Sequence, residues 1–170
     1  MRLFFALWPP PEAARALGEW AREVQARSGG RATRDETIHL TLAFLGDGDV
    51  SKASAAGRAV RARAFEFPLE QARYWPHNHV VWIGPRETPP ALADLVGQLH
   101  PALSQAGFQL EKRPFAAHVT LVRKAGRLDS IPRLPLVQWP VSEFLLLRSK
   151  VSGAGAQYEP LERFSLQAKS

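Results

Sequence analysis

The chain of 170 residues contains no cysteine and only one methionine. The absence of cysteine excludes disulfide bonds, thiolate metal ligands and a cysteine nucleophile. No apolar run approaches the roughly 20 residues that a membrane-spanning helix needs. The apolar run after Arg2 is too short for a signal peptide, and three prolines end it at residues 9–11 without a cleavage-site pattern. We therefore expect a cytoplasmic protein without a membrane partner.

Acidic residues are outnumbered: 16 Asp and Glu stand against 22 Lys and Arg, which gives a net charge of +6. Such a balance favours polyanionic partners by electrostatic attraction, although an ordinary arginine-rich surface produces it too. A chain of this length buries roughly 70% of its unfolded surface and needs no cross-links. We expect one domain over residues 1–170 and a monomer, and the charge is consistent with RNA or a nucleotide as the partner.

Histidine and threonine are scarce, with five of each, yet two of each occur in one repeated pattern. The two copies are His39-Leu40-Thr41-Leu42 and His118-Val119-Thr120-Leu121. In a strand, alternate side chains share a face, so each copy presents an imidazole and a hydroxyl on one face and apolar groups on the other. One copy alone is typical of a strand with a polar face. Two copies facing each other would supply a proton acceptor, a proton donor and two hydroxyls for phosphate oxygens, without a metal.

Hydrophobic periodicity predicts the elements around these copies. In the first half we expect a strand over 3–8, a helix from 11 to about 28, the motif strand up to Gly46 and a helix over 50–64. In the second half we expect strands over 69–75 and 80–83, a helix from 88 that Pro101 shortens or kinks, a strand over 108–111 and the second motif strand. A loop over 128–140 and strands over 141–147 and 158–166 complete the chain. The order strand, helix, motif strand, helix in both halves indicates a distant duplication.

The two motifs resemble the paired His-x-Thr-x motifs of the two-histidine phosphoesterases. Within that superfamily the chain is similar to the bacterial RNA 2′,3′-cyclic phosphodiesterases, the LigT/ThpR-like group historically named RNA 2′-5′ ligases. The resemblance runs almost end to end, through segments 2–9, 38–46 and 113–123 and a closing segment with Leu147-Arg148-Ser149, Gly155 and Tyr158. One departure is Ala117, where a proline often precedes the second histidine; it affects the entry to the strand and leaves the chemistry intact.

The resemblance implies an α+β fold with two lobes, in which duplicated antiparallel sheets are related by a pseudo-twofold axis and outer helices flank a central cleft. It implies strands that cross between the lobes, so that the chain is a single unit. It also implies metal-independent and cofactor-free hydrolysis of a terminal 2′,3′-cyclic phosphate to a 2′-phosphate. In that reaction His39 is the proton donor and His118 the proton acceptor, while Thr41 and Thr120 hold the phosphate.

Two further residues are candidate substrate contacts. Strict alternation places Arg123 on the face opposite His118, but the resemblance places it near the phosphate or the nucleotide. The same alternation places Phe44 with Leu42 in the core, unless a bulge reverses it and turns Phe44 toward the cleft as a base-stacking surface.

Three alternatives remain open on the sequence. The same two histidines could run the reverse reaction as an RNA 2′-5′ ligase, because an acid–base pair works in both directions. The chain could bind RNA or nucleotides without turnover. It could also be a metal hydrolase that uses His77 and His79, although no Asp, Glu or Cys lies close to them in sequence and a polar turn is favoured there.

Overall fold

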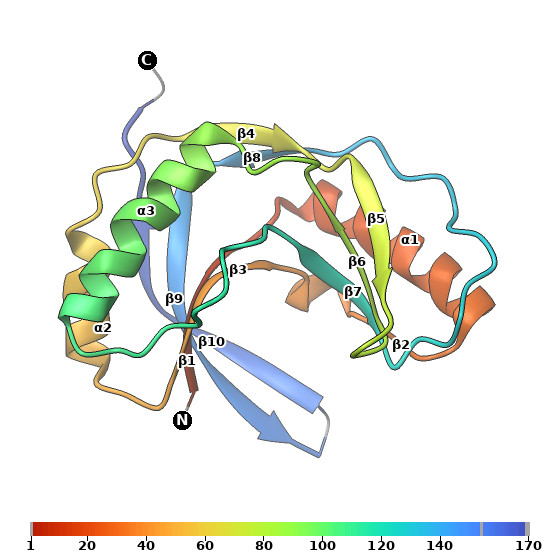
Figure 1. Cartoon of the computed structure of the whole chain (residues 1–170), viewed down its shortest axis with the longest axis horizontal. Coiled ribbons are helices and arrows are strands. Elements are labelled where there is room, and N and C mark those ends of the chain that lie inside the picture. Colours follow the sequence, from red (N-terminus) through yellow and green to blue (C-terminus); the bar gives the residue numbers. More distant parts are fainter. Residues whose placement is uncertain (1, 154, 169–170) are drawn as a thin grey trace.

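The computed structural model describes residues 2–153 and 155–168 (Figure 1). Three α-helices and one short 3-10 helix lie among the described residues: α1 (Pro11–Ser28), η1 (Asp35–Thr37), α2 (Val50–Arg58) and α3 (Pro90–Gln105). The strands are β1 (Arg2–Leu7), β2 (Arg31–Ala32), β3 (Leu40–Gly46), β4 (Phe65–Pro68), β5 (Gln71–Trp75), β6 (Val80–Gly84), β7 (Val119–Arg123), β8 (Gln138–Val141), β9 (Glu143–Ser152) and β10 (Gly155–Ser165).

The strands follow the order β10-β9-β1-β3-β7-β6-β5, with β2 paired to β7 and with β4 and β8 as a separate pair. Neighbouring strands along this order are antiparallel. In the described chain, β3 and β7 are paired at a single position, where Leu40 lies opposite Val119. The assembly is therefore two antiparallel sheets joined at one residue pair, which confirms the expected α+β fold with two repeated halves.

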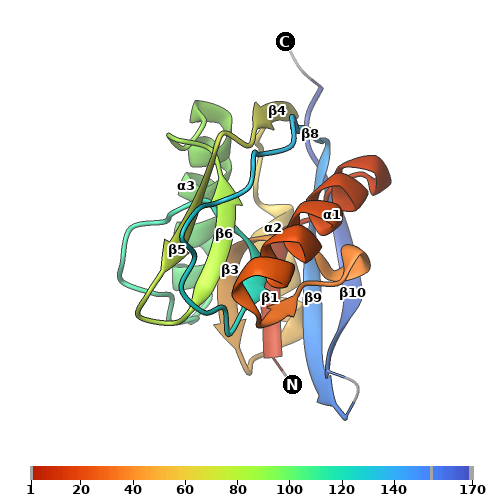
Figure 2. The same cartoon turned by 90° about the vertical axis from the view of Figure 1, so that its right-hand side faces the viewer.

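The helices lie outside the sheets and cross between the halves. In Figure 1, α1 lies on one side of the molecule and α2 with α3 on the other, and the view in Figure 2 agrees. Helix α1 follows β1 in the chain but packs against β2 and β7 of the other half. Helix α3 follows β6 but lies beside α2, and its His100 reaches the carbonyl of Leu42 in β3. Since each half supplies packing to the other, we propose that the chain folds as one two-lobed unit.

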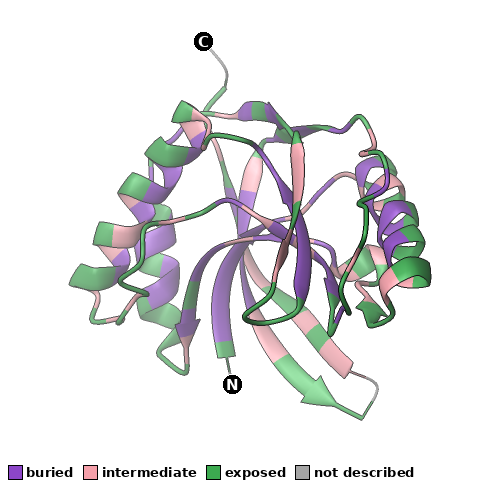
Figure 3. Ribbon diagram, turned by 45° about the vertical axis from the view of Figure 1, so that its right-hand side comes forward, coloured by how far each residue is buried: buried purple, intermediate pink, exposed green. Residues whose placement is uncertain are grey.

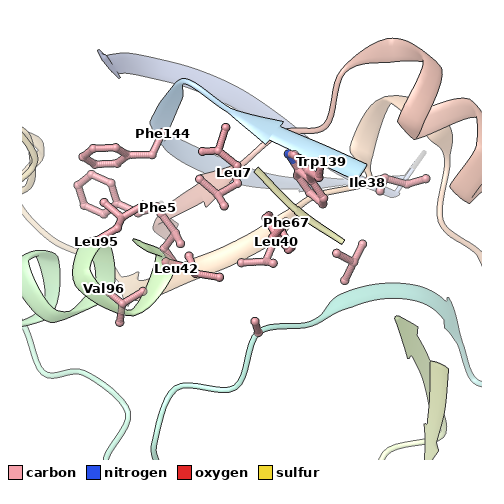
Figure 4. Packing of buried hydrophobic residues seen from close by; sticks show 14 of the residues in the cluster. Phe5, Leu7, Ile38, Leu40, Leu42, Phe67, Leu95, Val96, Trp139 and Phe144 are labelled. Carbon is pink, nitrogen blue, oxygen red and sulfur yellow. The ribbon is translucent and has the colours of Figure 1, made fainter. Parts of the chain in front are cut away.

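The core fills the space between these outer helices and the sheets, as the buried inner surfaces in Figure 3 indicate. The close view in Figure 4 shows Phe5 of β1, Leu42 of β3 and Leu95 of α3 within this packing. Burial of each such side chain contributes roughly 1.5–3 kcal/mol to folding. The apolar residues that recur at helical spacing in α1 and α3 predict the inner faces of these helices, and all of them are buried: Ala13, Leu17, Trp20 and Val24, and Leu92, Leu95, Val96, Leu99 and Leu103.

Several predicted boundaries are wrong, and long-range pairing explains the clearest case. The helix expected over 50–64 ends at Arg58, because the next segment pairs with the C-terminal end of the chain: Ala64 N–H donates to the carbonyl of Gln167 and Gln167 N–H to that of Ala62. Residues 108–111 form no strand, and the loop expected over 128–140 contains most of β8. Pro101 does not shorten α3, which extends to Gln105. The helix expected after the second motif strand is also wrong, because no helix occurs in the described segment between β7 and β8.

Candidate active site

The single pairing between β3 and β7 brings the two motifs together. Leu40 and Val119 are the central residues of the two His-x-Thr triplets, and the strands run antiparallel there. Extending this register by one residue each way places His39 opposite Thr120 and Thr41 opposite His118. His39 and His118 are then diagonal neighbours on one face, with backbone positions roughly 7–8 Å apart. This arrangement lets both side chains face one phosphorus centre.

A β-bulge follows each threonine. In β3, Thr41 lies opposite Ala6 and Ala43 lies opposite Phe5, so Leu42 is an extra residue. In β7, Thr120 lies opposite Trp82 and Val122 lies opposite Val81, so Leu121 is the extra residue. An extra residue reverses the alternation of faces beyond it. Phe44 and Arg123, each the fifth residue after its histidine, therefore lie on the same face as the threonine of their strand.

This reversal decides the placement of the two candidate substrate contacts. Phe44 lies opposite Phe4 and shares the face of Thr41; its side chain is 52% exposed, so the expectation of a core position is wrong. Arg123 lines the cleft together with both histidines, so the opposite-face placement that strict alternation gave is also wrong.

Each bulge carbonyl is bonded by the other half of the chain. The Nε2–H of His100 donates to the carbonyl of Leu42 at 2.8 Å. The backbone N–H of Thr33 donates to the carbonyl of Leu121 at 2.8 Å, and the Thr33 hydroxyl donates to the carbonyl of Thr120 at 3.0 Å. A bulge removes a carbonyl from the strand ladder, and an unpaired buried carbonyl is costly. These bonds therefore hold both bulges in place.

Both imidazoles are oriented in the same way. Nδ1 of His39 lies 2.7 Å from the carbonyl oxygen of Thr37, and Nδ1 of His118 lies 2.8 Å from that of Ala116. A carbonyl oxygen can only accept, so Nδ1 carries the hydrogen and donates in each case. Nε2 is then the nitrogen that is available in each ring to take or give a proton.

Aromatic rings surround His39. Trp8 stacks on the imidazole at 4.9 Å with 9° between the planes, and Tyr158 and Phe4 lie at 5.2 and 5.5 Å. The indole of Trp8 is fixed by a hydrogen bond that it donates to the carbonyl of Glu36. Burial among these groups lowers the pKa of His39 to about 4, and the positive charge of Arg123 contributes in the same direction. His39 is therefore neutral at pH 7 in the free protein.

His118 has a different environment. Trp75 approaches it edge to face at 4.8 Å, and Trp82 lies at 6.1 Å on the neighbouring strand β6. His118 is half-buried, and it lines a second cavity together with Trp75. Each histidine thus has a tryptophan neighbour from its own half of the molecule.

The cleft has a volume of about 440 Å³ and contains His39, Thr41, His118 and Thr120 in its lining. Three arginines line it as well, and no Asp or Glu is among its described lining residues: the arginines are Arg31, Arg34 and Arg123. Arg31 lies directly opposite Arg123 in the β2–β7 pair. Like charges placed opposite each other are unfavourable in a sheet, and a bound anion would relieve them. The cleft is therefore suited to a phosphate or another anion.

Two residues beside the motifs were not singled out as site residues on the sequence. Trp8, which stacks on His39, and Tyr158, which lines the cleft, come from opposite ends of the chain, and no local pattern marks them. His77 and His79 do not form a metal centre: in residues 2–153 and 155–168, no group of three or more His, Cys, Asp or Glu side chains gathers for a metal. His79 instead bonds the hydroxyl of Tyr74 at 2.9 Å. None of the helices described is long and apolar enough to cross a bilayer.

Two antiparallel lobes joined at paired His-x-Thr strands, with both imidazoles opening on one cationic cleft, are the architecture of a two-histidine phosphoesterase. Comparison with known proteins agrees at the level of sequence. The family model described as LigT-like phosphoesterase matches residues 7–82 and 83–156, and the chain belongs to this family.

The similarity extends over whole chains. The RNA 2′,3′-cyclic phosphodiesterase of Escherichia coli is 35% identical over 97% of this chain and 96% of its own length. The enzyme of that name from Thermus thermophilus is 31% identical over 99% and 92%. The crystal structure of E. coli LigT in its apo form superposes with a TM-score of 0.90 at 32% identity, covering 98% of this chain and 97% of LigT. LigT complexed with 3′-AMP gives the same TM-score and identity over 97% of both chains.

Proposed function

We propose that the protein hydrolyses 2′,3′-cyclic phosphodiester ends of RNA or nucleotides to 2′-phosphomonoesters. The observation that carries this proposal is the Leu40–Val119 pairing, which brings both His-x-Thr triplets to one face of one cleft. The names of the E. coli and Thermus relatives support the substrate class, and the LigT complex with 3′-AMP supports binding of a nucleotide monophosphate.

In this reaction a water molecule attacks phosphorus, and His118 Nε2 accepts a proton from that water. The bond between phosphorus and O3′ breaks, and His39 Nε2 gives its proton to the departing oxygen. The product carries a phosphate on O2′ and a free hydroxyl on C3′, and proton exchange with solvent restores both imidazoles. An acid and a base placed in this way each contribute roughly 10²–10⁴ in rate.

The phosphate itself is held by hydroxyls and charge. The hydroxyls of Thr41 and Thr120 can donate to the non-bridging oxygens from opposite strands. Arg123 and Arg31 add positive charge on the side of β2, where the substrate anion offsets their mutual repulsion.

The donor role of His39 requires that the substrate raises the pKa of this histidine from the value of about 4 in the free protein. A phosphate anion within a few ångströms favours the charged imidazolium, as an opposite charge does in general. The face of the Trp8 indole favours the same form through a cation–π interaction. Both effects act on the bound complex, in which the proton is needed.

The test uses His39→Ala and His118→Ala with two substrates in EDTA. One is a nucleoside 2′,3′-cyclic phosphate; the other has sulfur in place of O3′, which leaves without a proton. We expect each variant to lose roughly 10²–10⁴ in kcat on the oxygen substrate. On the sulfur substrate, His39→Ala should recover most of its rate and His118→Ala should not.

Full activity of His118→Ala on the oxygen substrate would refute the proposed function. Recovery of His118→Ala in place of His39→Ala would reverse the two roles and leave the reaction intact. Product analysis in the presence of a strand with a 5′-hydroxyl distinguishes hydrolysis from joining. Circular dichroism of each variant establishes that the loss is chemical and that the fold persists.

A further inference from the structure

The turn between β5 and β6 forms one edge of the cleft (Figure 1). It joins Trp75 to Val80, and its Asn78 lines both the cleft and the second cavity, which has a volume of about 510 Å³. His118, on the strand β7 that pairs with β6, lines both cavities as well. Asn78 therefore lies where the two cavities meet, on the side of the cleft that carries the proton acceptor.

The backbone is strained at two positions beside the cleft. Among the described residues other than glycine, only His79 and Lys124 have a positive φ, at 57° and 54°. His79 directly follows Asn78, which lines the cleft, and its strain therefore lies next to the site. Lys124 directly follows Arg123, which lines the cleft as well. Side chains rarely adopt this left-handed conformation, and such strain gathers where function requires a particular placement of a neighbouring group.

Hydrogen bonds tie the two strained segments to each other. The backbone N–H of Ala125 donates to the carbonyl of His79 at 2.9 Å. The hydroxyl of Tyr74 donates to the carbonyl of Ala125 at 3.3 Å and lies 2.9 Å from Nδ1 of His79. Because the single hydroxyl hydrogen goes to that carbonyl, Nδ1 of His79 carries a hydrogen and donates to the Tyr74 oxygen. These bonds fix the turn to the segment after β7, and with it the position of Asn78.

The attacking water has two hydrogens, and only one of them goes to His118. The other stays on the oxygen during the attack and needs an acceptor of its own. A water that is bonded through both hydrogens has a fixed orientation, with a lone pair left to attack phosphorus. Asn78 carries the only side-chain amide or carboxylate oxygen among the described lining residues of the cleft, whereas Thr41 and Thr120 offer hydroxyls that donate to the phosphate. The amide oxygen of Asn78 is therefore suited to the second hydrogen.

We propose that Asn78 orients the attacking water by accepting its second hydrogen at Oδ1 while His118 takes the first. This inference rests on the proposed function. The water oxygen bonds to phosphorus, the bond to O3′ breaks, and the second hydrogen leaves with the product phosphate and is lost to solvent. An alcohol has only one hydroxyl hydrogen, which goes to His118, so its attack needs no second acceptor. Asn78 therefore favours water over an alcohol, including the 5′-hydroxyl of an RNA strand, and so favours hydrolysis over joining.

The test lets water and methanol compete for adenosine 2′,3′-cyclic phosphate in EDTA. The products are adenosine 2′-monophosphate and its methyl ester, and chromatography gives their ratio. Both form in the same tube, so the ratio does not depend on how much of a variant is folded. We expect Asn78→Ala to raise the ratio of methyl ester to monophosphate about 2-fold to 10-fold, as the loss of one hydrogen bond to the water predicts.

Two further variants make the comparison specific. Asn78→Asp keeps a side-chain oxygen that can accept, so it should restore the wild-type ratio. His77→Ala is the matched control, because it removes a polar side chain from the same turn but from a position outside the described lining of the cleft. Its product ratio should equal that of the wild type.

An unchanged product ratio in Asn78→Ala overturns the inference, even if both products decrease, because the turn then supports the site as a whole. An equal rise in His77→Ala overturns it too, as does a ratio in Asn78→Asp as high as that in Asn78→Ala. The proposed function fails in a different way. If the wild type forms neither product, the proposed reaction is wrong; if the wild type forms the monophosphate and the ratio does not respond to residue 78, the reaction stands and the role of Asn78 falls.

Discussion

The stack of Trp8 on His39 should set the acid limb of the pH profile. Hydrolysis stops when both imidazoles are protonated, because no proton acceptor is then left. With a pKa of about 4, His39 takes up a proton only as the pH falls to that value, so the doubly protonated form accumulates there and we expect the acid limb of wild-type kcat/KM near pH 4. An unperturbed imidazole would give a limb near 6.5.

Trp8→Leu removes the stacked indole, which covers the ring at 4.9 Å, and lets water reach it. Since burial is the largest cause of the lowered pKa, the acid limb should move from about 4 toward 6.5. At pH 5, a histidine with a pKa of about 4 is about 90% neutral, and one with a pKa of 6.5 is about 3% neutral. If Trp8→Leu returns the pKa of His39 fully to 6.5, the ratio of kcat/KM at pH 5 to kcat/KM at pH 8 should drop by up to about 30-fold. Trp8→Phe, which keeps a ring, should shift the limb less.

The measurement is kcat/KM for a nucleoside 2′,3′-cyclic phosphate from pH 3.5 to 9, with an NMR titration of the histidine ring protons as an independent readout. A wild-type limb near 6.5 would show that the aromatic surroundings do not exclude water from His39. A Trp8→Leu limb that coincides with that of the wild type would show that the indole is not the cause.

Three further predictions follow from the site and its supports. Thr41→Val and Thr120→Val should each lower kcat/KM roughly 10-fold to 100-fold, as the loss of a hydrogen bond to a charged group predicts, and Ser should restore it; equal activity of the Val variants would exclude a phosphate contact. Between pH 6.5 and 4 the unfolded state binds more protons at His39 than the folded state does, so the free energy of unfolding should fall as the pH drops through this range, by at most about 3 kcal/mol. In denaturant titrations, His39→Gln should flatten this pH dependence, and an unaltered slope would contradict the linkage. His100→Leu leaves the Leu42 carbonyl without its donor and should cost about 1–3 kcal/mol of unfolding free energy, whereas a variant as stable as the wild type would mean that the bulge needs no support.

The sequence was sufficient for the elements that local patterns specify. The stripes of α1 and α3 repeat at helical spacing, and both are buried as predicted. The repetition of His-x-Thr in a chain poor in both residues indicated a shared cleft, because a single copy has an ordinary explanation and two copies do not. The family resemblance supplied the two-lobed arrangement, which periodicity alone does not give.

The sequence was insufficient wherever pairing between distant segments decides the outcome. The faces of Phe44 and Arg123 depend on bulges, and a bulge is an offset between two strands that neither strand records alone. The surroundings of His39 combine Trp8, Tyr158 and Phe4 from both ends of the chain, so its lowered pKa has no local signature. The early end of α2 likewise follows from pairing with Gln167 near the other end of the chain.

The antiparallel pair Leu40–Val119 relates the two His-x-Thr motifs by a local twofold axis, which bears on the direction in which a substrate strand can bind. An acid–base pair related by such an axis would accept a phosphodiester in either of two opposed senses. The two residues that follow the bulges make the two senses of binding unequal, because Phe44 carries an apolar ring and its counterpart Arg123 carries a guanidinium. We expect the exchange of the residues at 44 and 123 to favour the opposite sense of binding, while His39, Thr41, His118 and Thr120 keep their chemistry.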